Sequence, residues 1–488
     1  MGLLCAAAFS VLAWGSMRFM GPIGLVVVSA GLFSACVLLI LLVRKPIVIC
    51  AVWFLAMSGL QAVGMIRMPG LPDFSIARLF LVLVLIMIPI GVIRGRHLFT
   101  PPYAPDILVI AHAVYVLLNM YLLGDGLRFN TWVASSLAPA VGYFFGKQFV
   151  KEEGQLRVLL VFLSLVSVYF WVTCIGEHFE IRALVWPKEI LNRDIGNSWF
   201  GRSRGPFLQP SLTGQFLGWY LMIQLFLLTR RINITVKVLV VLNIAMIGVA
   251  LLYTYTRGPW LATAVGLGVM AVLRPGYRKM ILAASVVGVL MTVTDFLRPS
   301  QDEFLEERLG TTDTIENRLG FLATATRMIA EKPLFGVGYF QYLDEAPLYN
   351  RGTSIPFYGF VKRQAGADVA IHDIYIGRAA EEGLVSLMIF LGLVGVCAYH
   401  MRRQWRVAVA GTWYGRDFIA LTAGIAVSYL LHGMIIDFRY FDIINVLPLF
   451  LVGIVMSFPS PTDLAEAGGS PGDRLLAGMQ PGATRRAE

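Results

Sequence analysis

Residues 158–176 read VLLVFLSLVSVYFWVTCIG, a stretch without a charged side chain. An α-helix of this length can cross the hydrocarbon core of a bilayer, which is about 30 Å thick. The apolar residues are continuous rather than alternating, so the stretch does not fit a strand of a membrane β-barrel. Because only helices and closed barrels satisfy the backbone hydrogen bonds in lipid, it predicts a transmembrane helix.

Stretches of the same kind recur along the chain. They predict an all-α, polytopic membrane helix bundle of about 12–14 spans, near residues 3–16, 22–43, 47–66, 76–93, 106–123, 130–150, 158–176, 211–229, 234–255, 258–273, 279–297, 384–400, 416–435 and 441–457. The composition agrees, because only 14% of the 488 residues are charged, against about 25% in soluble domains. This excludes a cytosolic enzyme, a secreted disulfide scaffold and a nucleic-acid-binding domain.

The net charge of +10 is explained by where the basic residues lie. Alternate loops carry seventeen of them: Arg44, Lys45, Arg94, Arg96, Lys147, Lys151, Arg157, Arg230, Arg231, Lys237, Arg274, Arg278, Lys279, Arg402, Arg403, Arg406 and Arg416. The intervening short segments carry six: Arg18, Arg67, Arg78, Arg128, Arg257 and Arg439. Short cytoplasmic loops are enriched in Lys and Arg, so the first set is predicted to be cytoplasmic.

This orientation divides the chain into six predicted segments. They are N-terminal transmembrane helices (1–176), a first outer loop (177–210), central transmembrane helices (211–297), a large outer loop (298–383), C-terminal transmembrane helices (384–457) and a disordered cytoplasmic tail (458–488). The five cysteines lie in apolar stretches without a CxxC pair, which favours packing roles. The first 14 residues lack the basic region and cleavage site of a signal peptide, so we expect none.

The large outer loop should contain a helix. Asp313 and Glu316 have the spacing of a capping box, and Pro333 and Gly336 mark the end. An apolar series between them is expected to form one face: Ile315, Leu319, Leu322, Met328 and Ile329. This helix is expected to lie along the membrane surface or to cap the bundle.

Ionisable residues are almost absent from the predicted spans. His112 is the clearest case inside a span, and a lone histidine is more typical of a hydrogen-bonded packing residue than of a transport pathway. Transporters usually show chains of buried acidic residues or histidines and repeat symmetry between their halves, which we do not find. A secondary transporter or channel is therefore the weaker alternative, and a non-catalytic scaffold is a third.

Arginines gather on the predicted outer side, where the charge rule makes them unusual. They are Arg202, Arg204, Arg257, Arg318 and Arg378. A guanidinium presents a planar fork of donors that matches phosphate oxygens, and it keeps its charge. Taken singly, Arg257 could equally be an interfacial arginine that reaches the lipid headgroups. The cluster indicates a membrane-bound phosphate or diphosphate substrate.

His372 lies near the end of the large outer loop. A histidine there could accept a proton from an attacking hydroxyl at neutral pH, or it could be a structural residue at the start of the following helix. Carboxylates lie nearby, but none has metal-ligand spacing with His372: Asp344, Glu345, Asp368, Glu381 and Glu382. A metal-dependent nucleotide-sugar transferase is therefore not expected, and neither a metal nor another cofactor is predicted.

Four patches, in order, resemble the bacterial O-antigen ligase and polysaccharide polymerase superfamily. The first two are RGPFLQP at 204–210, similar to the family's R-G-x-F-x-N-P, and YTRGPW at 255–260, similar to its S-R-G-x-W. The others are ENR at 316–318 with EKPLFGVG at 331–338, and HDIY at 372–375 with EGL at 382–384. Each is short, but together they cover roughly residues 200–400 around the large outer loop.

The resemblance implies an enzyme of the bacterial inner membrane whose active site faces the periplasm. The donor would be a glycan on undecaprenyl diphosphate, and the acceptor either another such glycan or a lipid A-core sugar. Arg257, Arg318, Arg204 and Arg202 would bind the diphosphate, and His372 would be the general base. Asp373, Tyr375 and Glu382 would support them. Membrane lipids and a chain-length regulator are the other partners expected, and no nucleic acid.

Two departures from the family pattern bear on the site. Gln209 and Ser211 stand where the family often has Asn, and Asp373 stands where Asn usually follows the histidine. An Asp beside His372 would raise the basicity of the imidazole. The length of the chain and its large outer loop favour a polymerase for a surface polysaccharide, with an O-antigen ligase as the alternative.

Overall fold

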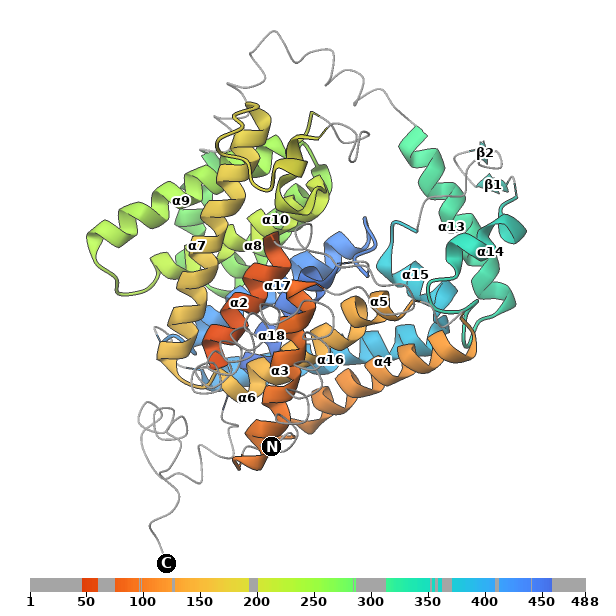
Figure 1. Cartoon of the computed structure of the whole chain (residues 1–488), viewed down its shortest axis with the longest axis horizontal. Helices are drawn as coiled ribbons and strands as arrows, with labels where there is room; N and C mark the ends of the chain where they lie inside the picture. The colour runs from red at the N-terminus through yellow and green to blue at the C-terminus, as the bar shows by residue number, and fades with distance from the viewer. Residues whose placement is uncertain are drawn as a thin grey trace, which may run out of the picture.

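The computed structural model describes residues 46–59, 75–95, 97, 99–124, 128–192, 201–283, 285–286, 313–351, 353–355, 359–361, 371–408, 412–439 and 441–458. Within these ranges the chain is almost entirely helical (Figure 1). The helices outside the large outer loop are α2 (Pro46–Gly59), α3 (Ile76–Ile93), α4 (Tyr103–Leu122), α5 (Phe129–Trp132), α6 (Ala138–Phe149), α7 (Glu153–His178), α8 (Pro210–Leu228), α9 (Ile234–Tyr253), α10 (Arg257–Leu273), α16 (Gly383–Val407), α17 (Arg416–Gly433) and α18 (Asp442–Met456). Short 3-10 turns cover Lys188–Leu191 and Gly205–Phe207.

The predicted spans coincide with these helices, which confirms a polytopic helical bundle. Span 76–93 is α3, and span 234–255 is α9 to within two residues. Six described helices are long and apolar enough to cross a membrane, namely α3, α4, α7, α8, α9 and α16, and three shorter ones are also apolar. Spans 3–16 and 22–43, most of 279–297, and the predicted tail lie outside the described residues.

Predicted span 130–150 is not one continuous α-helix. It consists of α5, a π-helical turn over Val133–Leu137, and α6. Pro139 has no backbone N–H with which to bond the carbonyl of Ser135, and the amide of Ala138 reaches back to the carbonyl of Val133 instead. The wider turn buries Ser135, whose hydroxyl lies 2.7 Å from that of Tyr339.

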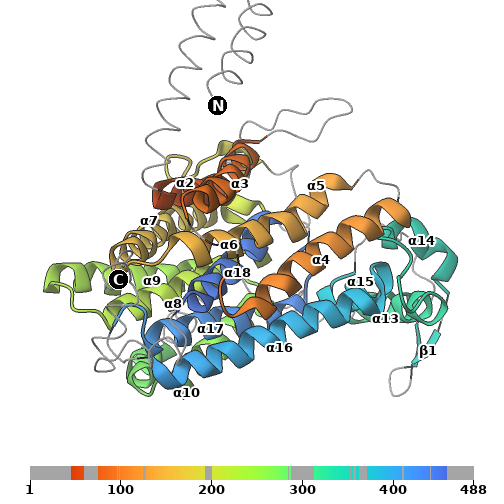
Figure 2. The same ribbon diagram turned by 90° about the horizontal axis from the view of Figure 1, so that it is seen from below.

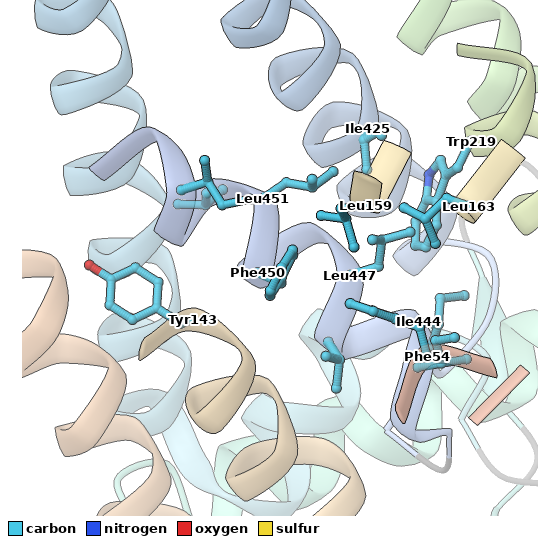
Figure 3. Close-up of a cluster of buried hydrophobic side chains, with 14 of the residues drawn as sticks. Phe54, Tyr143, Leu159, Leu163, Trp219, Ile425, Ile444, Leu447, Phe450 and Leu451 are labelled. Atoms are coloured by element: carbon cyan, nitrogen blue, oxygen red, sulfur yellow. The ribbon is translucent and has the colours of Figure 1, made fainter. Parts of the chain in front are cut away.

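The core lies around α6, α8 and α18. Nearly every residue of these three helices is buried, because their apolar side chains cover all sides rather than one stripe. Figure 3 shows Phe450, Leu447 and Ile444 of α18 among residues from several helices, including Trp219 of α8 and Phe54 of α2. The more exposed α9 and α16 lie at the periphery, with apolar faces suited to lipid.

The loops predicted to be cytoplasmic meet at one end of the bundle, which we call the basic end (residues 147–157, 229–231, 274–278 and 412–417). Asp417 accepts a hydrogen bond from Nε of Arg274 at 2.6 Å and also pairs with Arg230. The hydroxyl of Tyr414 donates to the carbonyl of Glu152 at 2.8 Å. Nζ of Lys147 donates to the carbonyl of Thr100 at 2.6 Å, which brings the 94–105 loop to the same end.

The described parts of the two predicted outer loops lie at the opposite end, which we call the loop end (residues 177–192, 201–210, 313–351, 353–355, 359–361 and 371–383). The large loop contains α13 (Asp313–Glu331), α14 (Tyr342–Tyr349), the antiparallel pair β1 (Thr353–Ile355) and β2 (Gly359–Val361), and α15 (Ile374–Glu381). Helices α13, α14 and α15 gather at one end of the long helices α4 and α16 (Figure 2). The strand pair is a local addition to an otherwise all-α fold.

The predicted helix in this loop is observed as α13, and it ends before Pro333 as expected. The predicted apolar face is partly wrong. Leu322 is 41% exposed, whereas Phe321, Ala325 and Met328 are buried. These three follow the spacing i, i+4, i+7, so the buried stripe is displaced by one residue at Leu322. The capping contacts expected at Asp313 and Glu316 lie outside the described side chains.

Two glycine turns join this loop to the start of α16. The amide of Val337 donates to the carbonyl of Ala380 at 2.9 Å, and the amide of Leu384 donates to the carbonyl of Pro333 at 2.8 Å. Gly336 and Gly383 have φ of +72° and +80°, and a Cβ atom on either would come within 2.4 Å of the other segment's backbone. The PLFGVG and EGL patches therefore pack backbone against backbone, and each needs a glycine at the contact.

Candidate active site

At the loop end, the C-terminal end of α17 packs against the first turns of α8, α10 and α15. Nε2 of His432 lies 2.9 Å from the hydroxyl of Ser211 in the first turn of α8. A Cβ atom on Gly258, at the start of α10, would lie 3.1 Å from the same nitrogen. A Cβ atom on Gly433 would lie 2.7 Å from Cγ2 of Ile374, at the start of α15. Arg257 directly precedes Gly258, and His372 lies two residues before Ile374, so both belong to segments that pack on this end of α17.

Arg257 is exposed at the first position of α10. Within the described part of the chain no hydrogen bond or ion pair engages its guanidinium. The hydroxyl of Thr256 donates to the carbonyl of Thr254 and does not cap the helix. The indole N–H of Trp260 donates to the carbonyl of Leu251 at 2.8 Å, which fixes the turn that leads into α10. The geometry leaves Arg257 available to an anion at the surface.

Arg204 has a different environment from the one that its motif suggested. Its side chain is fully buried, and its Nε donates to Oε1 of Glu177 at 2.9 Å. The guanidinium also donates to the backbone carbonyl of Ile190, and the amide of Arg204 donates to Oε2 of Glu177. No surface of this arginine is left to meet a diphosphate. It holds the first outer loop against the end of α7.

Arg202 lies two residues before Arg204 and is half-buried. Its Nε is buried without a hydrogen-bond partner among the described residues. The same segment is tied to the turn before α10, because the amide of Ser203 donates to the carbonyl of Tyr253 at 2.9 Å. The segment that carries Arg202 therefore lies against residues 253–256, which directly precede Arg257.

His372 is half-buried immediately before α15. Its ring lies edge-on to that of Phe321 of α13, with 6.2 Å between the centroids. Burial and the charge of nearby Arg318, which is itself exposed on α13, lower the pKa of His372 from its ordinary value, while Asp437 opposes them. A lower pKa favours the neutral imidazole at pH 7, which is the form that can accept a proton.

Asp373 and Tyr375 both have structural contacts. Oδ1 of Asp373 accepts from the amides of Tyr375 and Ile376, each at 2.8 Å, so Asp373 is the N-cap of α15. The hydroxyl of Tyr375 donates to the carbonyl of Leu430 in α17 at 2.7 Å. The carboxylate whose charge raises the pKa of His372 is Asp437, not the adjacent Asp373. Asp373 thus fixes the start of α15, and Tyr375 holds this helix against α17.

Beneath α15 lies a buried cluster of charged side chains that the sequence did not reveal. Arg439 pairs with Asp437 at 2.6 Å, with Glu381 at 2.6 Å and with Glu382 at 3.0 Å. Arg378 pairs with Glu382 at 3.0 Å and lies 2.7 Å from Nε2 of His112. Glu382 is therefore fully engaged with two arginines, and it supports the site by fixing the turn between α15 and α16.

An apolar cavity of about 550 Å³ lies between α4, α6, α16, α17 and α18. Arg378 and His112 line it near the loop end, and Trp405 lines it near the basic end. Phe390 and Trp405 are both on α16, and at 1.5 Å per residue the wall between them is about 22 Å long. A long, narrow, apolar space of this kind suits a hydrocarbon chain.

In the described residues, no group of three or more His, Cys, Asp or Glu side chains is arranged to hold a metal ion. Residues 241–391 match the family model described as O-antigen ligase. The matched region includes Arg257, Arg318 and His372, and the 204–210 patch lies before it. No curated protein matches the chain.

Proposed function

We propose that this chain, a multi-pass membrane protein of the O-antigen ligase-like superfamily, transfers glycan units from undecaprenyl diphosphate at the periplasmic face of the inner membrane. The product would be a surface polysaccharide, O-antigen or exopolysaccharide. The observation that supports the proposal is that the segments carrying Arg257 and His372 both pack on the His432–Gly433 end of α17, through Gly258 and Ile374. In the proposal, the exposed arginine binds a phosphate and the imidazole accepts a proton from a hydroxyl.

Arg257 contacts the diphosphate of the donor, with Arg202 and Arg318 contributing positive charge nearby. As the bond between the sugar carbon and the phosphate oxygen breaks, negative charge develops on the leaving diphosphate. Fixed cations aimed at this charge stabilise the transition state more than the ground state. Arg204, which is paired with Glu177, is a positioning residue for the loop that carries Arg202.

His372 removes the proton from the acceptor hydroxyl. The acceptor oxygen then forms a bond to the anomeric carbon while the bond to the diphosphate breaks, so the configuration at that carbon is inverted. The proton ends on the imidazole, and undecaprenyl diphosphate leaves with the bonding electron pair. The lowered pKa of His372 keeps the imidazole in its basic form at neutral pH.

The apolar cavity along α16 supports a lipid-linked substrate. A polyprenyl chain placed there would be shielded from water by helices on several sides, while Phe390 and Arg378 mark the end nearest α15. The polyprenyl chain already lies in hydrocarbon when it is in the bilayer, so the cavity would hold it by van der Waals packing rather than by removing it from water. The diphosphate headgroup would then lie at the loop end.

The acceptor is a second lipid-linked glycan in the polymerase form of this proposal. The alternative acceptor is a lipid A-core sugar, which the description of the matching family model as O-antigen ligase favours. Both use the same donor and the same chemistry.

The proposal is tested with purified protein in lipid nanodiscs, supplied with undecaprenyl-diphosphate-linked glycan. Longer lipid-linked glycans are expected with the donor alone if the protein is a polymerase. A glycan on lipid A-core, formed only when that acceptor is added, would identify the ligase form. Absence of transfer to either acceptor, from protein that is folded and monodisperse, would reject the proposed function.

A further inference from the structure

A serine and a histidine from distant parts of the chain form a pair beside Arg257. The hydroxyl of Ser211 lies 2.9 Å from Nε2 of His432. Ser211 is half-buried in the first turn of α8, whereas His432 is completely buried at the end of α17. Nδ1 of His432 has no hydrogen-bond partner in the part of the chain that the structure describes. This is unusual, because buried polar atoms are normally satisfied.

The unpartnered nitrogen decides which tautomer His432 adopts. A neutral imidazole has one N–H, and placing it on Nδ1 would bury a donor without an acceptor, which is the rarer kind of unsatisfied group. With the proton on Nε2, that N–H donates to Oγ of Ser211, and only a lone pair at Nδ1 is left unsatisfied. The hydroxyl proton of Ser211 then remains available to donate to a further acceptor.

The position of this hydroxyl indicates the charge of that acceptor. Helices α8 and α10 pack closely, since a Cβ atom on Gly214 would lie 2.9 Å from Cβ of Pro259. Both begin at the loop end, so the partial positive charges of two helix N-termini face the same region. Gly258 packs on the imidazole of His432, and Arg257 directly precedes it. This position therefore favours an anionic acceptor.

We propose that Ser211 is a second hydrogen-bond donor to the diphosphate of the lipid-linked substrate, beside Arg257. His432 is the positioning residue, since its Nε2–H occupies Oγ of Ser211 and turns the hydroxyl proton toward the phosphate oxygens. No proton is transferred by this pair. This inference rests on the proposed function and adds a residue from α8 to the site that the arginines form.

The test measures binding of undecaprenyl diphosphate to the protein in nanodiscs, together with KM and kcat for the lipid-linked donor. Hydrogen bonds to charged groups are the strong ones, so Ser211→Ala should weaken binding about 10-fold to 100-fold. His432→Leu should have the same effect, because it removes the N–H that orients Ser211. His432→Gln keeps an N–H donor and should restore binding to within about 3-fold. If Gln were as defective as Leu, the N–H role would be wrong.

A matched control lies one turn deeper between the same two helices. Nε2 of Gln215 donates to Oγ of Ser428 at 2.6 Å, and both residues are buried. Ser428→Ala should bind undecaprenyl diphosphate like the wild type. If it were as defective as Ser211→Ala, the effect would come from helix packing and the inference would fail. If Arg257→Ala lost binding while Ser211→Ala kept it, the role of Ser211 would be rejected and the proposed function would stand. Wild-type protein that neither bound nor transferred would reject the proposed function as well.

Discussion

Nε of Arg204 donates to Oε1 of Glu177 over 2.9 Å, so an arginine that its motif suggests as a phosphate ligand is instead closed off inside the protein. Arg257, from the next motif along the chain, is exposed at the first position of α10. Two arginines with similar sequence surroundings thus have opposite environments. Substitution of Arg204 should therefore change the stability of the protein, whereas substitution of Arg257 should change its interaction with substrate.

Arg204→Ala should destabilise the protein. It leaves the carboxylate of Glu177 buried without its cation, a change that typically costs about 3–5 kcal/mol. Thermal unfolding in detergent is the measurement. Arg257→Ala is the matched control and should unfold at the wild-type temperature, because its side chain is exposed. Equal stability of the two variants would contradict the structural role of Arg204.

Arg257 should be required for transfer, and lysine should not replace it. Arg257→Ala is expected to lower kcat by about 100-fold to 1,000-fold, the usual effect of removing one donor to a developing negative charge. Arg257→Lys keeps the charge but loses the planar fork, so most of the loss should remain. The measurement is the rate of transfer from lipid-linked glycan. Normal polysaccharide synthesis by Arg257→Ala would return this residue to an interfacial role.

His372→Ala should abolish most transfer while the protein stays inserted and folded. A positioned general base contributes about 10²–10⁴-fold to the rate, which is visible as loss of long-chain polysaccharide. Glu331→Gln is the control, because Glu331 is an exposed carboxylate at the end of α13 in the same loop. Near wild-type transfer by purified His372→Ala would show that another group, such as Asp344, Glu345 or Asp368, takes the proton, or that no protein base is needed.

The pH profile of transfer should depend on Arg318. The base must be neutral, so the rate should fall as the pH drops through the pKa of His372. Burial and then Arg318 lower that pKa, and removing the positive charge with Arg318→Gln should raise it. The acidic limb of the kcat/KM profile should therefore move to higher pH. A shift to lower pH, or none, would show that His372 does not set this limb.

The side assignment of the two ends is testable by cysteine labelling. In a variant without its five native cysteines, Arg278→Cys at the basic end should be protected from an impermeant reagent in intact cells. Leu348→Cys, at a side chain of α14 that is 65% exposed, should be labelled. Both positions are at the surface, so accessibility of the thiol does not bias the comparison. The reverse pattern would overturn the map, and the periplasmic mechanism with it.

At the loop end, the sequence patches point to some residues of the candidate site but not to the charged residues that support it. The patches identified Arg257 and His372, and these are the residues that the fold leaves exposed or half-exposed beside one helix end. The same patches could not show that Glu382 is held between Arg378 and Arg439, since Arg439 lies outside every patch. In the sequence, this buried cluster appears only as two separate pairs of charged residues, Glu381 with Glu382 and Asp437 with Arg439, and nothing in the sequence connects them.

The sequence by itself determined the helices and the grouping of the loops. Both depend on properties of neighbouring residues: a charge-free stretch such as 158–176 must be helical in lipid, and basic loops stay together on one side. The tertiary structure alone decided which polar groups are free to act. Arg204 is neutralised by Glu177, and Ser211 meets His432 across 221 residues of chain. Burial and ion pairing depend on distances in space, which local composition does not encode, so which arginines are paired and which are exposed is decided only when the helices pack.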